Sequence, residues 1–342
     1  MRRDGSRVFH VAGTDAGKPL AGVLRSLLND ESADAAELLR DRRVQIDGNL
    51  CQELSRRLKL GEVIKVLPHT IAAPPTEKDI RVHFADEHLV VVEKPSGLTT
   101  MRHEEEADWR GRRRRLESTL DDLLPRVLGQ WIGSRQSPSR DAKSKQRTNS
   151  RGPISASRIP VIPVHRLDRE TSGLMVFALT PKAERSLVEQ FREHSIDRTY
   201  LAVVIGKIEE QTIESYLARD RGDGKRGSVT DPDQGQRAVT HISPIESLMG
   251  CTLIECRLET GRTHQIRIHL SEAGHPVCGD KEYRGPLGQK PIVDRSAAPR
   301  LALHAAELGF EHPVTKKPLH FESKLPRELA QWLSRFRNKP HG

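Results

Sequence analysis

The sequence has few aromatic residues, few cysteines and no long apolar run. Phe, Trp and Tyr account for 4 % of its 342 residues, which argues against large aromatic interfaces. The cysteines, Cys51, Cys251, Cys256 and Cys278, are too few and too scattered for a disulfide scaffold. No stretch approaches the ~20 apolar residues of a membrane-spanning helix, and the opening MRRDGSRVFH lacks the apolar centre of a signal peptide. We therefore expect a cytoplasmic protein without membrane contact.

Motifs for metal ions and for phosphate-bearing cofactors are also missing. Cys251 and Cys256 lie in a predicted strand, where side chains at this spacing point to opposite faces, so they cannot bind one metal ion. His264 and His269 diverge as well, because five residues of a helix correspond to about 140° of rotation. The sequence contains no glycine-rich phosphate loop. We predict no cofactor and no bound metal.

Positive charge is in excess. Lys and Arg number 56 against 47 Asp and Glu, which gives a formal net charge of +9 and favours a polyanionic partner. The length exceeds the roughly 100–200 residues of one domain, so we expect at least two domains. Hydrophobic residues make up 35 % and charged residues 30 % of the chain, which indicates at least one stretch outside any core.

Residues 7–68 are predicted to form a small α+β module. Apolar residues recur at helical spacing in 19–28 and again in 33–42, and Asp47-Gly48 is typical of a tight turn between two strands. Arg43 and Arg56 belong to a basic group on and around this hairpin. The order helix, helix, hairpin resembles the S-four-like RNA-binding module, and this resemblance implies that both arginines contact RNA. A solvated basic face is the alternative.

Residues 69–79, which include Pro74 and Pro75, are interpreted as a linker to a second domain at 80–335. An insertion interrupts this domain at about 102–160. It contains one possible short helix, STLDDLLPRVLG, and is otherwise rich in Ser, Arg, Lys and Pro, so we expect it to be disordered. The basic run Arg112–Arg115 within it is either a solvated segment or a direct RNA contact.

Three polar clusters interrupt the apolar segments of the second domain. VHRLDRETSGL places Asp168 in a turn ahead of a buried strand, where an ionised carboxylate is costly unless it is paired. A turn-capping aspartate is the alternative. RTYLAVVIG is a strand that contains Tyr200, and a buried tyrosine hydroxyl needs a partner. ETGRTHQIRIH gathers Arg262, His264 and Arg267 at the beginning of a helix, which suits a phosphate or a carboxylate.

In this order the segments resemble the motifs of RluA-type RNA pseudouridine synthases. The similar stretches are VVVEKPSGL, HRLDRETSGL, RTYLAVVIG, TGRTHQIRIHLSEAGHPVCGDKEY and LALHAAELGFEHPVTKKPLHFESKLP, which together cover about residues 80–330. The resemblance implies an α+β fold with a mixed, mainly antiparallel central sheet, in a monomer. It implies an enzyme that isomerises uridine to pseudouridine in structured RNA without a cofactor. Ribosomal RNA is the expected substrate ahead of transfer RNA.

The resemblance also implies a role for each motif residue. Asp168 would be the catalytic carboxylate, with Arg267 as the cation that keeps it ionised. Tyr200 would stack on the target uracil. The sequence leaves open whether Asp168 attacks the sugar, attacks the base or removes a ribose proton. The remaining candidates in the second domain are expected to contact RNA: Arg166, Arg262, His264 and Gln265.

Other functions stay open at this point. A catalytically inactive RNA-binding or ribosome-assembly protein would have the same fold. A metal-dependent hydrolase would use His165, His264 and Asp168. The stretch after KPSGL, TTMRHEEEADW, contains His103, and the sequence does not settle whether this histidine lies near the substrate.

Overall fold

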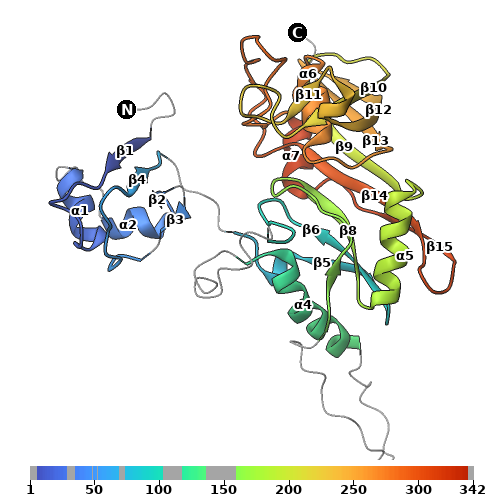
Figure 1. Ribbon diagram of the computed structural model, residues 1–342, viewed down its shortest axis with the longest axis horizontal. Coiled ribbons are helices and arrows are strands. Elements are labelled where there is room, and N and C mark those ends of the chain that lie inside the picture. The colour runs from blue at the N-terminus through green and yellow to red at the C-terminus, as the bar shows by residue number, and fades with distance from the viewer. Residues whose placement is uncertain are drawn as a thin grey trace, which may run out of the picture. The chain divides into compact units, whose positions relative to one another are not determined.

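The structure, a computed structural model, describes residues 6–28, 35–47, 49–51, 53–68, 74–102, 118–135 and 159–337. The chain divides into two compact units, Met1–Pro74 and Pro75–Gly342, and Figure 1 shows the helices and strands of each. His103, Arg112–Arg115, most of the Ser- and Arg-rich insertion and the first part of the expected linker lie outside the described residues. At the end of that linker, Glu77–Asp79 forms a short 3-10 helix.

The first unit packs two helices against a small antiparallel sheet with the strand order β1-β4-β2-β3. Leu20, Leu24, Val44 and Ile64 are completely buried in one shared cluster, so α1, β2 and β4 contribute their apolar faces to a common core. Both predicted helices and the predicted hairpin are present. The elements are β1 (Arg7–His10), α1 (Leu20–Leu27), α2 (Ala35–Arg40), β2 (Val44–Ile46), β3 (Asn49–Leu50) and β4 (Val63–Val66).

The second unit contains one large sheet with the strand order β11-β10-β12-β13-β9-β14-β8-β6-β5, to which β15 and β7 add at β14 and β8. Among the described strands, only β8 and β14 pair in parallel, with His304 opposite Ser172. This confirms the prediction of a mixed, mainly antiparallel sheet. The strands are β5 (Arg81–Ala85), β6 (Leu89–Lys94), β7 (Ile162–Pro163), β8 (Ser172–Ala178), β9 (Asp197–Ile205), β10 (Gln211–Ala218), β11 (Gly227–Val229), β12 (Gln236–Leu248), β13 (Cys251–Leu258), β14 (Leu303–Glu311) and β15 (Pro318–Glu322).

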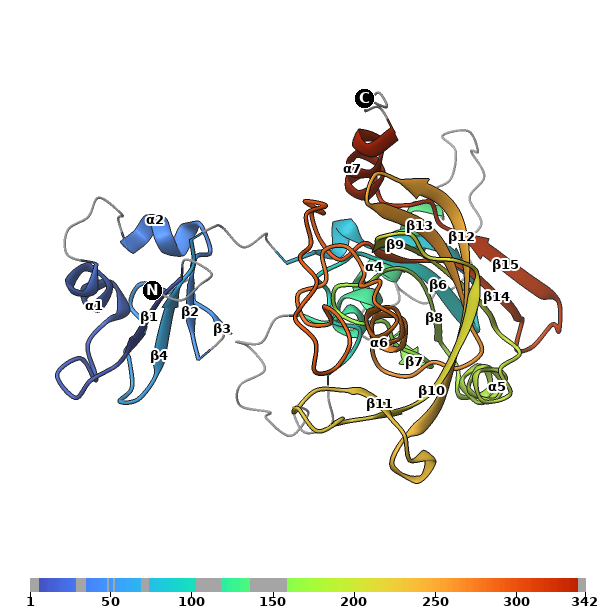
Figure 2. The same cartoon turned by 90° about the horizontal axis from the view of Figure 1, so that it is seen from above.

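Strand β8 is buried on both faces, which explains its unbroken apolar sequence. Met175 and Phe177 pack in the cluster that includes α4 (Leu120–Arg135), whereas Leu174 and Val176 pack with α5 (Pro181–Arg192) on the other face. Figure 2 shows the two helices well apart, with the strands between them. Leu120, Leu124 and Leu128 of α4 are at most 1 % exposed. Helix α4 is therefore part of the core, although the sequence places it inside the insertion.

Helices α6 (Gln265–Glu272) and α7 (Arg327–Arg337) complete the second unit. Helix α6 begins directly after His264 and buries Ile266, Ile268 and Leu270. Helix α7 buries Trp332, whose indole Nε1 donates to the carbonyl oxygen of Ser296 at 2.8 Å. No helix within the described ranges is long and apolar enough to span a membrane.

Candidate active site

Asp168 lies in the loop just before β8, and a second loop holds this loop in place. The supporting segment is residues 95–100, which follows β6 and includes the end of the KPSGL motif. It donates three hydrogen bonds to main-chain oxygens around Asp168: from Thr100 Oγ1 to Leu167 (2.8 Å), from Gly97 N to Arg169 (2.8 Å) and from Ser96 Oγ to Glu170 (2.6 Å). The segment that follows β6 therefore holds the HRLDRETSGL loop in place.

Lys94 is buried beneath both loops. Its Nζ donates to the carbonyl oxygens of Pro95 (3.1 Å), Leu98 (2.8 Å) and Arg169 (3.1 Å). Burial lowers the pKa of Lys94 to about 7, while the negative charges of Asp168 and Glu170 act in the opposite direction. The sequence motifs alone assign no role to Lys94. The signal was the alternation along β6, because Lys94 falls two residues after Val92 and so shares a face with the buried side chains of Val90 and Val92.

Two cationic or polar side chains face the carboxylate of Asp168. The Oδ2 atom lies 3.9 Å from Nη1 of Arg267, and Oδ1 lies 3.8 Å from Nε2 of His264. Both distances exceed that of a hydrogen bond, so these contacts do not occupy the lone pairs of the carboxylate. The Asp168 side chain is 17 % exposed. It therefore sits in a largely enclosed position with oxygens that a substrate can approach.

Arg267 is held mainly by Asp280. Its Nε and Nη2 donate to the two carboxylate oxygens of Asp280 at 2.7 and 3.0 Å, and Nη2 also reaches Glu282 at 3.3 Å. The guanidinium carbon lies 4.8 Å from the ring centroid of Tyr283, a cation–π contact. The sequence predicts Asp168 as the partner of Arg267; the structure makes Asp168 a longer, secondary contact. Asp280 and Tyr283 were not predicted as site residues, although both belong to the quoted segment GDKEY.

His264 connects Asp168 to Tyr283. Its Nδ1 lies 2.8 Å from the Tyr283 hydroxyl, and its backbone is left-handed, with φ 60° and ψ 16°. Burial lowers the pKa of His264; the charge of Asp168 opposes this shift and that of Arg267 adds to it. The sequence assigns His264 to RNA contact, whereas its described contacts are to the other members of this cluster.

Tyr200 lies in β9, at the centre of the sheet, opposite Cys256 of β13 and Ala305 of β14. Its side chain belongs to the main core cluster. Burial raises the pKa of Tyr200; Arg198 lowers it, and the negative charge of Asp168 raises it further. Asp168 therefore interacts electrostatically with Tyr200 and with Arg267, so the three predicted catalytic side chains gather in one region of the second unit.

The other predicted RNA-binding residues of the second unit differ in how exposed their side chains are and in whether they have partners within the protein. Arg166 is exposed, and Arg262 donates from Nε to the carbonyl oxygen of Arg237 at 3.0 Å. Gln265 is 3 % exposed. Its amide group accepts from Thr260 Oγ1 and Arg262 N and donates to Val239 O and Thr240 Oγ1. The RNA contact predicted for Gln265 is replaced by these interior hydrogen bonds, because polar groups buried this deeply need partners.

The two arginines predicted to bind RNA in the first unit have partners within that unit. Arg56 pairs with Glu62 at 2.8 Å, and Arg43 donates from Nε to the carbonyl oxygen of Leu67 at 2.9 Å. The Arg56 side chain therefore supports the connection between β3 and β4, and that of Arg43 links the residue before β2 to the residue after β4. An RNA contact by Arg43 or Arg56 stays a prediction.

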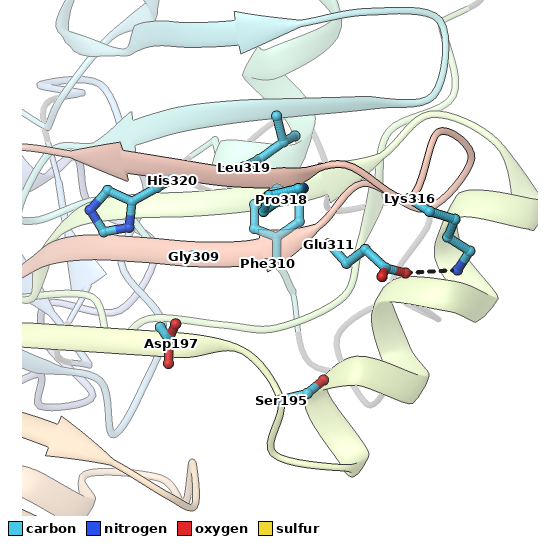
Figure 3. Close-up of a pocket in the computed structure, with 9 residues that line it drawn as sticks. All are labelled: Ser195, Asp197, Gly309, Phe310, Glu311, Lys316, Pro318, Leu319 and His320. Atoms are coloured by element: carbon cyan, nitrogen blue, oxygen red, sulfur yellow. Dashed lines mark ion pairs between the residues drawn. The ribbon is translucent and has the colours of Figure 1, made fainter.

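A surface cavity of about 310 Å³ lies elsewhere in the second unit, between the end of α5 and the β14–β15 hairpin (Figure 3). Lys316 and Glu311 form an ion pair across its rim at 3.0 Å. No predicted site residue lines this cavity. The residues that line the cavity are Ser195, Asp197, Gly309, Phe310, Glu311, Lys316, Pro318, Leu319 and His320.

Among the described residues, no group of three or more His, Cys, Asp or Glu side chains could hold a metal ion.

Comparison with known proteins gives a consistent result. Residues 88–272 match the family described as RNA pseudouridylate synthase. Ribosomal large subunit pseudouridine synthase D of Zymomonas mobilis is 36 % identical over 77 % of this chain and 74 % of its own length. An uncharacterised RNA pseudouridine synthase of Bacillus subtilis is 30 % identical, with 92 % of each chain covered.

Among solved structures, human RNA pseudouridylate synthase domain containing 4 superposes with a TM-score of 0.53 at 24 % identity. The match covers 75 % of this chain and 93 % of the human chain. This similarity supports the fold of the second unit.

Proposed function

This chain belongs to the RluA-type family of RNA pseudouridylate synthases, and from this premise we propose that it converts uridine to pseudouridine in ribosomal RNA, with Asp168 as the catalytic carboxylate. The observation that carries the proposal is the position of Asp168. Its side chain is mostly enclosed and lies within 4 Å of His264 and Arg267, yet neither is close enough to occupy its oxygens.

The reaction sets clear demands on such a group. Isomerisation breaks the bond between N1 of uracil and C1′ of ribose, forms a bond between C5 and C1′, and leaves N1 with the proton while C5 loses its own. Attack by Asp168 on the sugar, attack on the base and removal of a ribose proton all require an ionised carboxylate with an available lone pair. Arg267 supplies the neighbouring positive charge, and its two hydrogen bonds to Asp280 hold the guanidinium in place.

Tyr200 suits the binding of the target base. Its backbone is paired on both sides, with β13 and β14, its ring packs in the core cluster, and its raised pKa keeps the hydroxyl protonated at neutral pH. A uridine within folded RNA must leave its stack to reach these groups, at a free-energy cost of a few kcal/mol. A rigid aromatic ring offsets part of this cost by stacking on the displaced base. The exposure of Arg166, two residues before Asp168, supports a role in filling the gap left by the displaced base or in holding its backbone.

The proposal of ribosomal RNA rests on the relatives. Several curated relatives, including those of Zymomonas mobilis and Nitrosomonas europaea, carry the name ribosomal large subunit pseudouridine synthase D. The excess of positive charge agrees with any RNA substrate and does not separate ribosomal from transfer RNA. Mapping pseudouridines by chemical modification and primer extension, in both RNA classes from cells with and without the gene, makes the distinction. Loss of a site in transfer RNA alone would contradict the proposal.

The role of Asp168 is tested with Asp168→Asn, which keeps the size of the side chain and removes its charge. We expect the release of tritium from RNA labelled at uridine C5 to disappear, while RNA binding stays within about twofold of the wild type. Asp233→Asn, at an exposed position in the short 3-10 helix Pro232–Gln234, is the matched control and should remain fully active. Normal tritium release by Asp168→Asn would refute the assignment. Inactivity of the wild-type protein on every RNA would favour the inactive RNA-binding alternative.

A further inference from the structure

His264 has a strained backbone where the loop meets α6. Its φ of 60° and ψ of 16° lie in the left-handed region, which non-glycine residues rarely adopt. The side chain does not compensate for this strain by capping the helix, because it makes no cap hydrogen bond. Glycine would adopt this conformation more readily. Strain of this kind at a reactive site indicates that the imidazole itself has a task there.

The imidazole of His264 bridges two groups of the site. Tyr283 lies on one side, with its hydroxyl 2.8 Å from Nδ1 and its ring 5.4 Å away at 72°. Asp168 lies on the other side, with Oδ1 3.8 Å from Nε2. Arg267 faces the other oxygen, Oδ2, so each oxygen of Asp168 lies near a different side chain.

The surroundings of His264 determine its charge. Asp168 and Glu282, whose Oε2 lies 3.9 Å from Nδ1, favour the protonated form, whereas Arg267 and Arg226 oppose it. Burial also opposes it and is the largest contribution, so the pKa of His264 falls below its usual value. The ring is therefore neutral at physiological pH and carries its one proton on either Nδ1 or Nε2.

The contacts on both sides of the ring select the Nε2–H tautomer. Burial raises the pKa of Tyr283, so its hydroxyl retains a proton and can donate it to Nδ1. With the proton on Nδ1 instead, the lone pair of Nε2 would face the carboxylate of Asp168, which is unfavourable. The Tyr283 hydroxyl would then also lack an acceptor within the described part of the chain.

We propose that His264 is a positioning residue whose Nε2–H donates to Oδ1 of Asp168 when substrate closes the site, and that Tyr283 fixes the proton on that nitrogen. Hydrogen bonds of this kind are often long before substrate binds and shorten in the complex. The donor holds the carboxylate in one orientation opposite Arg267 and stabilises its ionised form. This inference rests on the proposed function, since Asp168 is the carboxylate assigned there.

Two substitutions of His264 distinguish the loss of the hydrogen-bond donor from a loss of protein stability. His264→Gly relieves the backbone strain and removes the ring, so the full-length protein should be at least as stable as the wild type in urea. Its single-turnover rate of tritium release should fall about 100-fold, the effect of losing one buried donor at a reacting charge. His264→Gln keeps an N–H donor of similar reach and should retain activity within about tenfold of the wild type. RNA affinity should be unchanged in both variants.

The pH dependence distinguishes positioning from a merely structural role. In His264→Gly, the acid limb of the pH–rate profile should move to higher pH, because Asp168 has lost a donor that favours its ionised form. In His264→Gln it should stay close to that of the wild type. Equal loss of rate in both variants with unchanged profiles would overturn the proposal, as would full activity of His264→Gly.

The tautomer is measured without RNA, so this test stays independent of the proposed function. Two-bond proton–nitrogen NMR spectra of the full-length protein labelled with ¹⁵N-histidine distinguish Nε2–H from Nδ1–H, and His264→Gln identifies the signal. We expect the Nε2–H form at pH 7 in the wild type and a mixture of both tautomers in Tyr283→Phe. A cationic ring or the Nδ1–H form in the wild type would overturn the inference. A wild-type protein with the expected tautomer but no activity on any RNA would instead contradict the proposed function.

Discussion

Gly173, the last-but-one residue of HRLDRETSGL, should tolerate no side chain. Its φ is +123°, and a Cβ atom there would lie 2.2 Å from the carbonyl oxygen and 2.5 Å from the nitrogen of Ala305. The obstacle is the backbone of β14, which pairs in parallel with β8 at this point. A flexible side chain could move aside, but a paired strand cannot do so without breaking its hydrogen bonds.

The magnitude follows from two contributions. A non-glycine residue at this φ costs about 1–3 kcal/mol in strain, and displacing the β14 backbone adds about 1–3 kcal/mol of overpacking. Gly173→Ala should therefore lower the free energy of unfolding by about 2–6 kcal/mol, a large share of the ~5–15 kcal/mol of a typical domain. Gly288→Ala is the matched control. Gly288 has a φ of +77°, and a Cβ atom added there would meet nothing within 4 Å, so strain alone applies, at about 1–2 kcal/mol.

Urea unfolding followed by tryptophan fluorescence measures both variants. The tryptophans among the described residues, Trp131 and Trp332, belong to the second unit, which also contains Gly173. With a slope of about 3 kcal/mol per M, a loss of 3 kcal/mol lowers the midpoint by about 1 M. If Gly173→Ala and Gly288→Ala unfold at the same urea concentration, the close approach of β8 and β14 described above is wrong.

Two further predictions concern charge. Asp280→Asn should weaken the hold on Arg267 and slow single-turnover tritium release about 10–100-fold with unchanged RNA affinity; an unaltered rate would show that Arg267 needs no anchor. His304 is completely buried, and burial lowers its pKa to about 4. Because the unfolded chain takes up this proton near pH 6.5, the stabilising effect of neutral His304 is complete above that pH and is lost as the pH falls towards 4. Between pH 6.5 and 5, the free energy of unfolding measured with urea should fall by about 2 kcal/mol more in the wild type than in His304→Gln. An equal fall in both proteins would refute this.

The strands and helices of the chain could largely be predicted from local pattern. Helix α5 follows general capping preferences, with Pro181 at its first position and Thr180 Oγ1 accepting from the backbone nitrogen of Ala183. Helix α4 was harder to place because its leucines lie beside a long polar stretch, and only packing against β6 and β8 shows that it belongs to the core. Sequence composition describes a window of residues, whereas burial depends on what folds against it.

The site was predictable as a set of motifs and only partly as a geometry. Asp168, Tyr200 and Arg267 come from the three segments that carry the family resemblance, and the structure brings them to one region. The partnership of Arg267 with Asp280 could not be derived from spacing, because the two are joined by a turn after α6. The prediction for Gln265 was wrong because its burial could not be read from the sequence. A polar residue at the beginning of a helix suggests a ligand contact, whereas the hydrogen-bond partners of Gln265 lie on β12 and in the preceding loop.

The parallel pairing of β8 with β14 has a consequence for the order in which the protein acquires its activity. Ser172 and His304 can pair only after the 131 residues between them have been synthesised. Contacts of such long sequence separation form late, because closing the chain over that distance is entropically unfavourable. The loop that carries Asp168 leads straight into this junction. We therefore expect a nascent or refolding molecule to form much of its secondary structure before the pairing of β8 with β14 positions the loop that carries Asp168.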